Sequence, residues 1–265
     1  MGYNTKIKYF PNSNSIQIKT YSWTIEEGSN FAVNSSKHKV YDNIQEAQKN
    51  AIKSQNTSLR RTKNMIYDIA KSNENFFTHF CTLTFDPKKV DSFNYDEVSK
   101  KVTNYLNRMR KRNDNLKYIG VMEKHKSGRY HFHFLMGGCE NMDFLESGHK
   151  TSNGDIIYNI GSYRLGWSTA TQIRDKSRSC SYLTKYITKC LFEHTKNKKR
   201  YWCSKNLARP HEEKLNLDLD SYTDVFESDA DYHKHIDIPT INQSMEIYEF
   251  KKELLQQTTE LLHDN

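Results

Sequence analysis

Hydrophobic and polar positions follow a strand period in some segments of this chain and a helix period in others. Ser15–Ile25 alternates and predicts a strand. Phe76–Phe85, rich in aromatic and β-branched residues, predicts a second one. Apolar residues at helical spacing predict amphipathic helices over 43–72 and 95–111.

The next part of the chain predicts a β-hairpin, with a turn at Lys126–Gly128 between two strands within 117–138. A strand near Ser168–Ile173 and a helix over 178–194 follow. A hairpin enclosed by strands and helices in this order predicts an α+β fold of the split βαβ or ferredoxin-like kind.

After Pro210 the composition becomes acidic, with a weak strand near Met245–Phe250 and a short helix over 254–262. We therefore expect an accessory segment over 1–75, a central domain over 76–210 and an acidic region over 211–265.

Charge is distributed unevenly between these regions. Residues 1–210 hold 36 Lys and Arg against 18 Asp and Glu, whereas residues 211–265 hold 4 against 14. A basic body with an acidic end is typical of a nucleic-acid-binding protein, although a merely soluble Lys-rich surface is the alternative. The candidate phosphate contacts are Arg60, Arg61, Lys63, Arg108, Arg110, Lys111, Arg112, Lys198, Lys199 and Arg200.

The five cysteines include no C-x-x-C pair, which argues against a disulfide framework and a zinc ribbon and favours a reducing compartment. No apolar run is long enough to cross a bilayer, and the first residues do not form a signal peptide. We expect a soluble, cytoplasmic protein.

The segment GRYHFHFLMGG places His131 and His133 on one face of a strand, because alternate residues of a strand share a face. If the hairpin pairs Glu123 with His131, two imidazoles and a carboxylate gather on that face. Such a set leaves open positions on a divalent metal, which catalysis requires. Packing histidines are the simpler alternative, and His125 in the turn is a competing ligand.

The segment SYLTKYITKC carries two tyrosines four residues apart, Tyr182 and Tyr186. Each is followed three residues later by a lysine, Lys185 or Lys189. A lysine can stabilise a phenolate and contact a phosphate oxygen, which a metal would polarise. Two tyrosines that only cover a helix flank are the alternative. In FCTLTF, the hydroxyls of Thr82 and Thr84 share one face of a strand.

Taken in order, FCTLTF, Glu123 with His131-Phe132-His133, and YLTKYITK resemble the three motifs of the HUH replication-initiator endonucleases. These are the rolling-circle Rep proteins of small phages, plasmids and single-stranded DNA viruses. The paired tyrosines resemble the two-tyrosine subgroup of microvirus and filamentous-phage initiators. The segment KRYWCSKNLARP is also similar to one that follows the catalytic helix in those proteins.

The resemblance covers roughly residues 76–210 and implies an endonuclease domain with a ferredoxin-like antiparallel sheet of about five strands. It implies Mg²⁺ or Mn²⁺ at His131, His133 and Glu123, and DNA contacts that include Thr82 and Thr84. Tyr186 or Tyr182, assisted by Lys185 and Lys189, would form a 5′-phosphotyrosyl link with single-stranded origin DNA.

The free 3′-OH would prime the host polymerase, and the second tyrosine would close the copied circle. No G-x-x-x-x-G-K-[ST] motif is present, so unwinding would need a host helicase in the bacterial cytoplasm. A relaxase or transposase of the same superfamily, a 2-His-1-carboxylate iron oxygenase and a non-catalytic nucleic-acid-binding protein are the alternatives. The oxygenase would not explain the tyrosine helix, and the binding protein would not explain the metal ligands.

Overall fold

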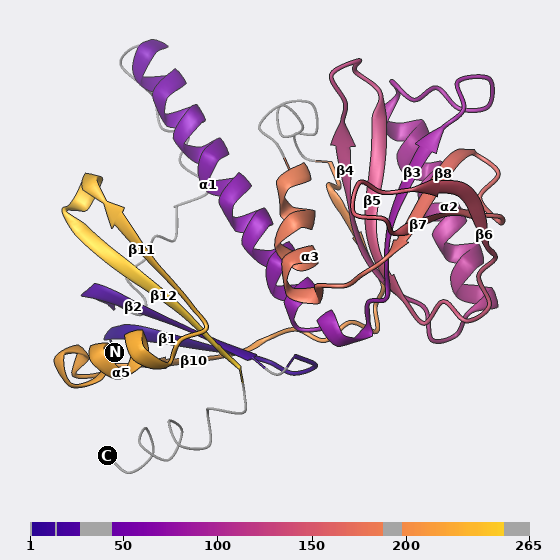
Figure 1. The fold of residues 1–265 in the computed structure, drawn as a ribbon. Coiled ribbons are helices and arrows are strands. Elements are labelled where there is room, and N and C mark those ends of the chain that lie inside the picture. The colour runs from indigo at the N-terminus through magenta and orange to yellow at the C-terminus, as the bar shows by residue number, and fades with distance from the viewer. Residues whose placement is uncertain (1, 14, 27–43, 188–197, 252–265) are drawn as a thin grey trace. The chain divides into compact units, whose positions relative to one another are not determined.

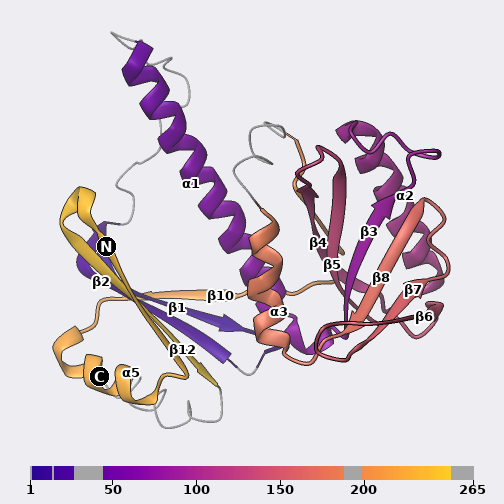
Figure 2. The ribbon, with the colours of Figure 1, turned by 45° about the horizontal axis from the view of Figure 1, so that its top comes forward.

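The computed structural model describes residues 2–13, 15–26, 44–187 and 198–251 and has two antiparallel sheets (Figures 1 and 2). The prediction of an α+β fold is confirmed. The chain divides into two compact units, one made of residues 44–208 and the other of residues 1–43 with 209–265.

The unit of residues 44–208 is built on a seven-stranded sheet in the order β6-β7-β8-β3-β5-β4-β9, where about five strands were expected. β6, β7 and β9 were not predicted, because β9 has only three residues and most side chains of β6 are exposed and polar. The elements of this unit are α1 (Ile44–Lys71), η1 (Glu74–Phe76), β3 (His79–Phe85), α2 (Tyr95–Arg112), β4 (Lys117–Lys124), β5 (Tyr130–Gly137), β6 (Phe144–Lys150), β7 (Ile156–Ile160), β8 (Gly166–Gln172), α3 (Lys176–Leu183), η2 (Thr184–Tyr186) and β9 (Tyr201–Cys203).

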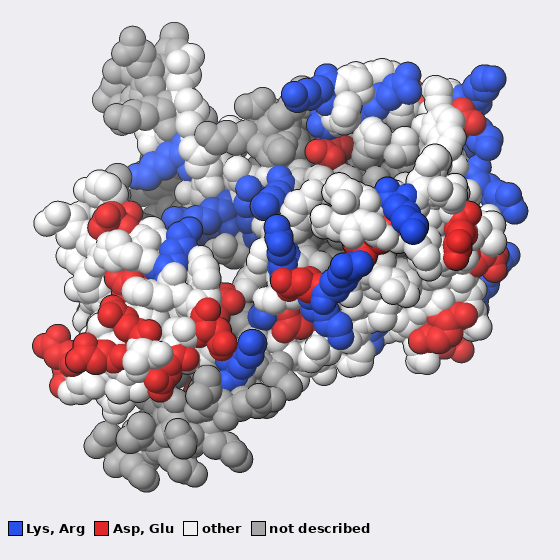
Figure 3. Space-filling model, in the orientation of Figure 1, with Lys and Arg blue, Asp and Glu red and all other residues white. Residues whose placement is uncertain are grey.

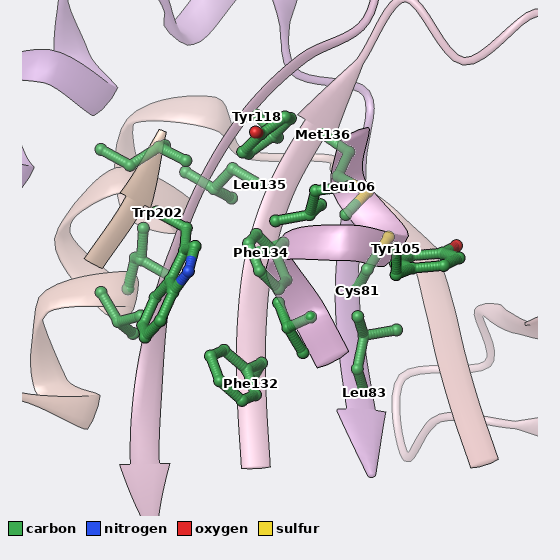
Figure 4. Packing of buried hydrophobic residues seen from close by; sticks show 14 of the residues in the cluster. Cys81, Leu83, Tyr105, Leu106, Tyr118, Phe132, Phe134, Leu135, Met136 and Trp202 are labelled. Atoms are coloured by element: carbon green, nitrogen blue, oxygen red, sulfur yellow. The ribbon is translucent and has the colours of Figure 1, made fainter. Parts of the chain in front are cut away.

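One face of this sheet packs against α2 in the hydrophobic core, and the buried Ile119, Val121 and Leu135 of the opposite face belong to the same core. Its strands contribute side chains such as Leu83, Phe132, Phe134 and Trp202, all buried (Figure 4). The amphipathic helix α2 adds its own buried face, which consists of Val98, Val102, Tyr105, Leu106 and Met109. Because residues alternate between faces, this core directs the neighbouring residues of the same strands to the opposite face.

The opposite face of the sheet is covered only in part. α3 contacts β5, and α1 contacts both α3 and β4, so the two helices lie over the β4–β5 side (Figure 2). On the other side of β3, the side chains of Trp167 and Thr169 in β8 are exposed on this face. A partly open sheet face bordered by helices is where a site can be reached from solvent.

The helix predicted over 178–194 is interrupted within the described residues. α3 ends at Leu183, η2 follows, and Ile187 is extended. The Thr184 hydroxyl donates a hydrogen bond to the Ser181 carbonyl oxygen at 2.8 Å, a side-chain contact that competes with the helical backbone pattern. Residues 188–194 lie outside the described part of the chain.

The second unit is a five-stranded sheet in the order β10-β1-β2-β12-β11 with its own small core. Its elements are β1 (Gly2–Phe10), β2 (Ser15–Glu26), β10 (His211–Leu215), α5 (Leu219–Asp229), β11 (Tyr232–Ile238), η3 (Pro239–Ile241) and β12 (Gln243–Lys251). The predicted strands at Ser15–Ile25 and Met245–Phe250 correspond to β2 and β12, whereas the helix predicted over 254–262 lies outside the described residues.

Strand pairing joins the two ends of the chain in this unit. β1 pairs with β10, and β2 pairs with β12. The segment expected over 1–75 is therefore shared between the units, since α1 belongs to residues 44–208. Within the described residues, no helix is long and apolar enough to cross a membrane.

The two units differ in charge. Residues 44–208 hold 30 Lys and Arg against 15 Asp and Glu, a net charge of +15. The other unit holds 10 against 17, a net charge of −7. On the face drawn in Figure 3, Lys and Arg follow α1, while Asp and Glu gather over the unit of β11, β12 and α5.

Candidate active site

The hairpin of β4 and β5 has the register that the histidine hypothesis required. Glu123 pairs with His131, and Val121 pairs with His133. The turn between the strands contains Gly128, whose φ of 86° is readily adopted only by glycine. His131, His133 and Glu123 therefore share the partly open face of the sheet.

Two threonines of β3 hold the imidazole rings from the neighbouring strand. Thr82 pairs with His133, and its Oγ1 lies 3.1 Å from Nδ1 of that ring. Thr84 Oγ1 lies 3.1 Å from His131 Nδ1. These contacts orient both rings and leave each Nε2 as the nitrogen that can bind another group. The predicted DNA contacts of Thr82 and Thr84 stay predictions.

Glu123 makes the third contact of this cluster. Its Oε2 lies 2.7 Å from His133 Nε2, and its side chain is partly exposed. In this arrangement His133 donates its Nε2 proton to Glu123 and accepts from the Thr82 hydroxyl at Nδ1. A hydroxyl can also accept a hydrogen bond. Thr82 is therefore equally suited to the tautomer of His133 that carries its proton on Nδ1 and a free lone pair on Nε2.

Burial lowers the pKa of His131 and of His133 below the ordinary value for histidine. The nearby His125 lowers the pKa of His131 further, whereas the hydrogen bond that His133 donates to Glu123 partly offsets the effect of burial on the pKa of His133. Both rings are therefore neutral near pH 7, which is the form that binds a metal.

The donor types and protonation states of Glu123, His131 and His133 fit a divalent metal of the Mn²⁺ kind. The separation of 2.7 Å between Glu123 Oε2 and His133 Nε2 is also compatible with two atoms that bind one ion. His131, the third proposed donor, does not form one group with these two atoms, however. Among the described residues, no group of three or more His, Cys, Asp and Glu side chains is placed to hold a metal ion.

Tyr186 lies directly on this cluster. Its ring stacks on His133 with 3.6 Å between the ring centroids and 14° between the planes. The ring of Tyr182 meets Tyr186 edge-on at 5.4 Å, and Tyr182 is 42% exposed. The interruption of the helix matters here, because Tyr182 belongs to α3 whereas Tyr186 belongs to the tighter turn η2.

Burial raises the pKa of the Tyr186 hydroxyl well above the ordinary tyrosine value, and the hydrogen bond with Tyr182 and the negative charge of Glu123 raise it further. Tyr186 is therefore a protonated phenol at neutral pH. Positive charge brought close to Glu123 would remove one of these causes and ease the loss of the phenol proton.

Of the two lysines in the tyrosine segment, the structure describes only Lys185. Lys185 Nζ lies 5.1 Å from the centre of the Tyr182 ring, a cation–π contact. Lys189 lies outside the described residues, so its predicted role is not tested.

The predicted phosphate contacts are spread over the unit of residues 44–208. Arg60 and Arg61 are exposed on α1, and Lys63 is half-buried there. Arg108 is exposed on α2, which covers the other face of the sheet, so the fold does not bring it to the histidines. All of these DNA contacts remain predictions.

The basic residues near β9 already have protein partners. Lys198 Nζ pairs with Asp96 at 3.0 Å, and Lys199 Nζ lies 5.1 Å from the Trp202 ring. The backbone carbonyl of Arg200 accepts a hydrogen bond from the Met122 N–H at 3.4 Å, which places Arg200 beside β4. A phosphate would compete with the carboxylate of Asp96 for Lys198.

Sequence reasoning missed Phe80, which completes the aromatic cluster. Its ring lies 5.8 Å from that of Tyr182, 6.2 Å from Tyr186 and 6.1 Å from His133. The signal was available, because Phe80 alternates with Thr82 and Thr84 and must share their face. Its contact with two tyrosines about a hundred residues later could not be read from that alternation.

Residues 78–191 match the model of one protein family, replication-associated protein ORF2/G2P. The matched segment contains Glu123, both histidines and both tyrosines. The match supports a role in DNA replication as a replication initiator. Neither the curated proteins nor the solved structures include a significant match to the chain.

Proposed function

We propose that this protein is an HUH-type endonuclease that starts and ends rolling-circle replication by nicking and rejoining single-stranded origin DNA. The observation that carries the proposal is the stacking of the Tyr186 ring on His133, 3.6 Å away and beside Glu123. A nucleophile, two neutral imidazoles and a carboxylate on one partly open face are the parts that such a reaction needs. The family match over residues 78–191 supports the same function.

In the proposed reaction, Tyr186 Oη attacks the scissile phosphorus and the bond to the 3′-oxygen breaks. The phenol loses its proton to solvent and the departing 3′-oxygen gains one, which leaves a 5′-phosphotyrosyl link and a free 3′-OH. His133 holds the ring of Tyr186 in position by stacking. Lys185 and Lys189 are the cations proposed to stabilise the phenolate and contact phosphate oxygens.

Glu123, His131 and His133 would hold Mg²⁺ or Mn²⁺, which would supply positive charge to the scissile phosphate. Thr82 and Thr84 keep the two imidazoles oriented for that role. Burial contributes as well, because it keeps both rings neutral and so leaves a lone pair on each.

Tyr182 is the second nucleophile in this proposal. After a full strand has been copied, Tyr182 Oη attacks the scissile phosphorus of the new origin and the bond to its 3′-oxygen breaks. That 3′-oxygen attacks the phosphorus of the Tyr186 link, which closes the first circle, frees the Tyr186 phenol and leaves the DNA on Tyr182. A host polymerase extends the free 3′-OH while a host helicase unwinds the duplex. The replicating DNA is that of a phage or plasmid in the bacterial cytoplasm.

The test is covalent capture of DNA by the full chain. Single-stranded oligonucleotides that tile the replicon encoding the protein are incubated with it and Mn²⁺, and adducts are resolved on denaturing gels. Mass spectrometry then identifies the attached tyrosine. We expect one origin oligonucleotide to react, with the DNA on Tyr186.

Substitution separates the two tyrosines. Tyr186→Phe is expected to lower adduct formation and to leave the remaining DNA on Tyr182, whereas the Tyr182→Phe/Tyr186→Phe protein should lose the adduct by more than about 100-fold, because no further nucleophile is left. Tyr182→Phe should still form the adduct on Tyr186 but should not form a second covalent link with another origin strand, and Tyr158→Phe, half-buried in β7, serves as the matched control. An adduct that persists in the Tyr182→Phe/Tyr186→Phe protein would contradict the nucleophile assignment.

The histidines are tested separately. His131→Ala or His133→Ala should abolish metal-dependent cleavage while salt-sensitive DNA binding is largely retained. Unchanged cleavage in these variants would eliminate the proposed metal site and leave the tyrosine chemistry to be explained without it.

A further inference from the structure

Trp167, at the start of β8, is the large hydrophobic side chain most exposed among those of the described residues, with 60% of its surface open to solvent. Its ring makes no aromatic or cation–π contact within the part of the chain that the structure describes. Single exposed apolar residues are common on protein surfaces and need no function by themselves. Its position in the sheet is what sets Trp167 apart.

Trp167 stands in one row with the candidate active site. It pairs with Thr84 of β3, the residue whose hydroxyl contacts His131, and His131 pairs in turn with Glu123. Cross-strand partners project from the same face of a sheet, so the indole shares the face of the histidines. Two strand spacings separate β8 from β5, a distance on the order of 10 Å.

The neighbouring surface is open and positively charged. Thr169, the next residue of β8 on this face, is also exposed. Lys88, Lys89 and Arg164 are exposed at the same end of the sheet, where the Asp86 N–H donates a hydrogen bond to the Leu165 carbonyl oxygen at 3.0 Å. Lys89 Nζ approaches the Asp86 carboxylate at 3.8 Å. A polyanion is the partner that this charge favours.

We propose that Trp167 is a substrate-binding residue, on which an unpaired base of the single-stranded DNA beside the scissile phosphate stacks. An exposed indole next to cations fits single-stranded nucleic acid, because every base offers an aromatic face and the backbone carries the negative charge. A duplex keeps its bases stacked inside and offers no such face to the indole. The inference rests on the proposed function for the identity of the DNA and extends it to the path of the strand.

The experiment measures binding without cleavage. The full chain carrying Tyr182→Phe and Tyr186→Phe is titrated without metal against a labelled oligo-dT and against an abasic oligomer of the same length. The abasic strand keeps the phosphates and removes the bases. Trp167→Ala is compared with Trp167→Tyr, which keeps an aromatic ring, and with Trp23→Ala in β2 of the other unit as the control.

We expect Trp167→Ala to weaken binding of oligo-dT by about 5- to 150-fold, the range for loss of one stacked base, and to leave binding of the abasic strand unchanged. Trp167→Tyr should retain most of the affinity. The exposure of Trp167 means that the thermal unfolding midpoint should not change, which is checked for every variant.

Three results would overturn the inference. Equal binding of oligo-dT by Trp167→Ala and its parent would show that no base stacks there. An equal loss on the abasic strand would show that the effect does not come from a base. A parent that is dimeric by sedimentation and becomes monomeric in Trp167→Ala would show that a second copy of the chain covers the indole.

The outcomes distinguish failure of the stacking site from failure of the proposed function. If no oligonucleotide forms a covalent adduct but Trp167→Ala still loses base-dependent affinity, the nicking proposal falls and the stacking site stands. If adducts form normally and the affinity is unchanged, only the stacking site falls.

Discussion

At the scale of single residues, the candidate site depends on small polar contacts that position its aromatic rings. Thr82 and Thr84 lie against Nδ1 of the two histidines at the same distance, 3.1 Å. Each hydrogen bond contributes only about 1 kcal/mol to stability. Their larger effect is on ring orientation, which decides whether both Nε2 atoms can serve one ligand.

Thr82→Val is therefore expected to weaken Mn²⁺ binding by about 10- to 100-fold, the usual effect of removing a group that orients a metal ligand. The shape of the side chain is retained, so the thermal unfolding midpoint should change little. Isothermal titration of the full chain with Mn²⁺ measures the affinity. Thr169→Val, which pairs with Thr82 from β8 but faces solvent, is the matched control. Equal affinities in both variants would show that Thr82 does not orient a metal ligand.

At the scale of elements, the tyrosine segment is held at its start by a buried ion pair. Lys71 at the end of α1 contacts both carboxylate oxygens of Glu74 at 3.1 and 2.9 Å and the Ser177 hydroxyl at 2.8 Å. Ser177 lies in the first turn of α3, so the cluster joins α1, η1 and the helix that carries Tyr182. A buried lysine needs this compensation for its lost hydration.

Glu74→Ala is expected to lower the free energy of unfolding by about 3–5 kcal/mol, because it leaves the Lys71 ammonium buried without its counter-charge. Chemical denaturation of the full chain measures the change. Asp96→Ala breaks the exposed pair with Lys198 and should cost no more than about 1 kcal/mol. A similar loss of unfolding free energy in both variants would show that burial does not increase the contribution of the Lys71–Glu74 pair to stability.

At the scale of the whole molecule, charge is divided between the units, with +15 on residues 44–208 and −7 on the unit formed by the two chain ends. The proposed site and its tyrosines belong to the basic unit. A polyanion should therefore bind there chiefly through phosphate contacts that release counterions.

Affinity for single-stranded DNA is accordingly expected to fall by at least about tenfold between 50 and 200 mM salt. Fluorescence anisotropy with a labelled oligonucleotide gives the slope of log affinity against log salt. Arg60→Gln with Arg61→Gln should make this slope shallower, whereas Lys234→Gln on exposed β11 of the acidic unit should not. A slope unaffected by the arginine changes would remove α1 from the binding surface.

Local order in the sequence was enough to predict several parts of this protein. Strand alternation correctly predicted that His131 and His133 share a face, and the turn at Gly128 made the pairing with Glu123 predictable. These features are short-range, since a period of two residues and a tight turn determine them. The helices α1 and α2 were also predictable from a short-range pattern, the spacing of apolar residues three and four positions apart.

Only the tertiary structure decided which distant segments meet. The pairing of β3 with β5 brings the threonines to the imidazoles, and the end of α3 at Leu183 brings the Tyr186 ring onto His133. Pairing of β1 with β10 likewise unites the chain ends in one sheet. Such contacts depend on how complete faces are buried and strands find partners, information that no local period contains. The sequence by itself determined which side chains share a strand face, and packing determined what that face meets.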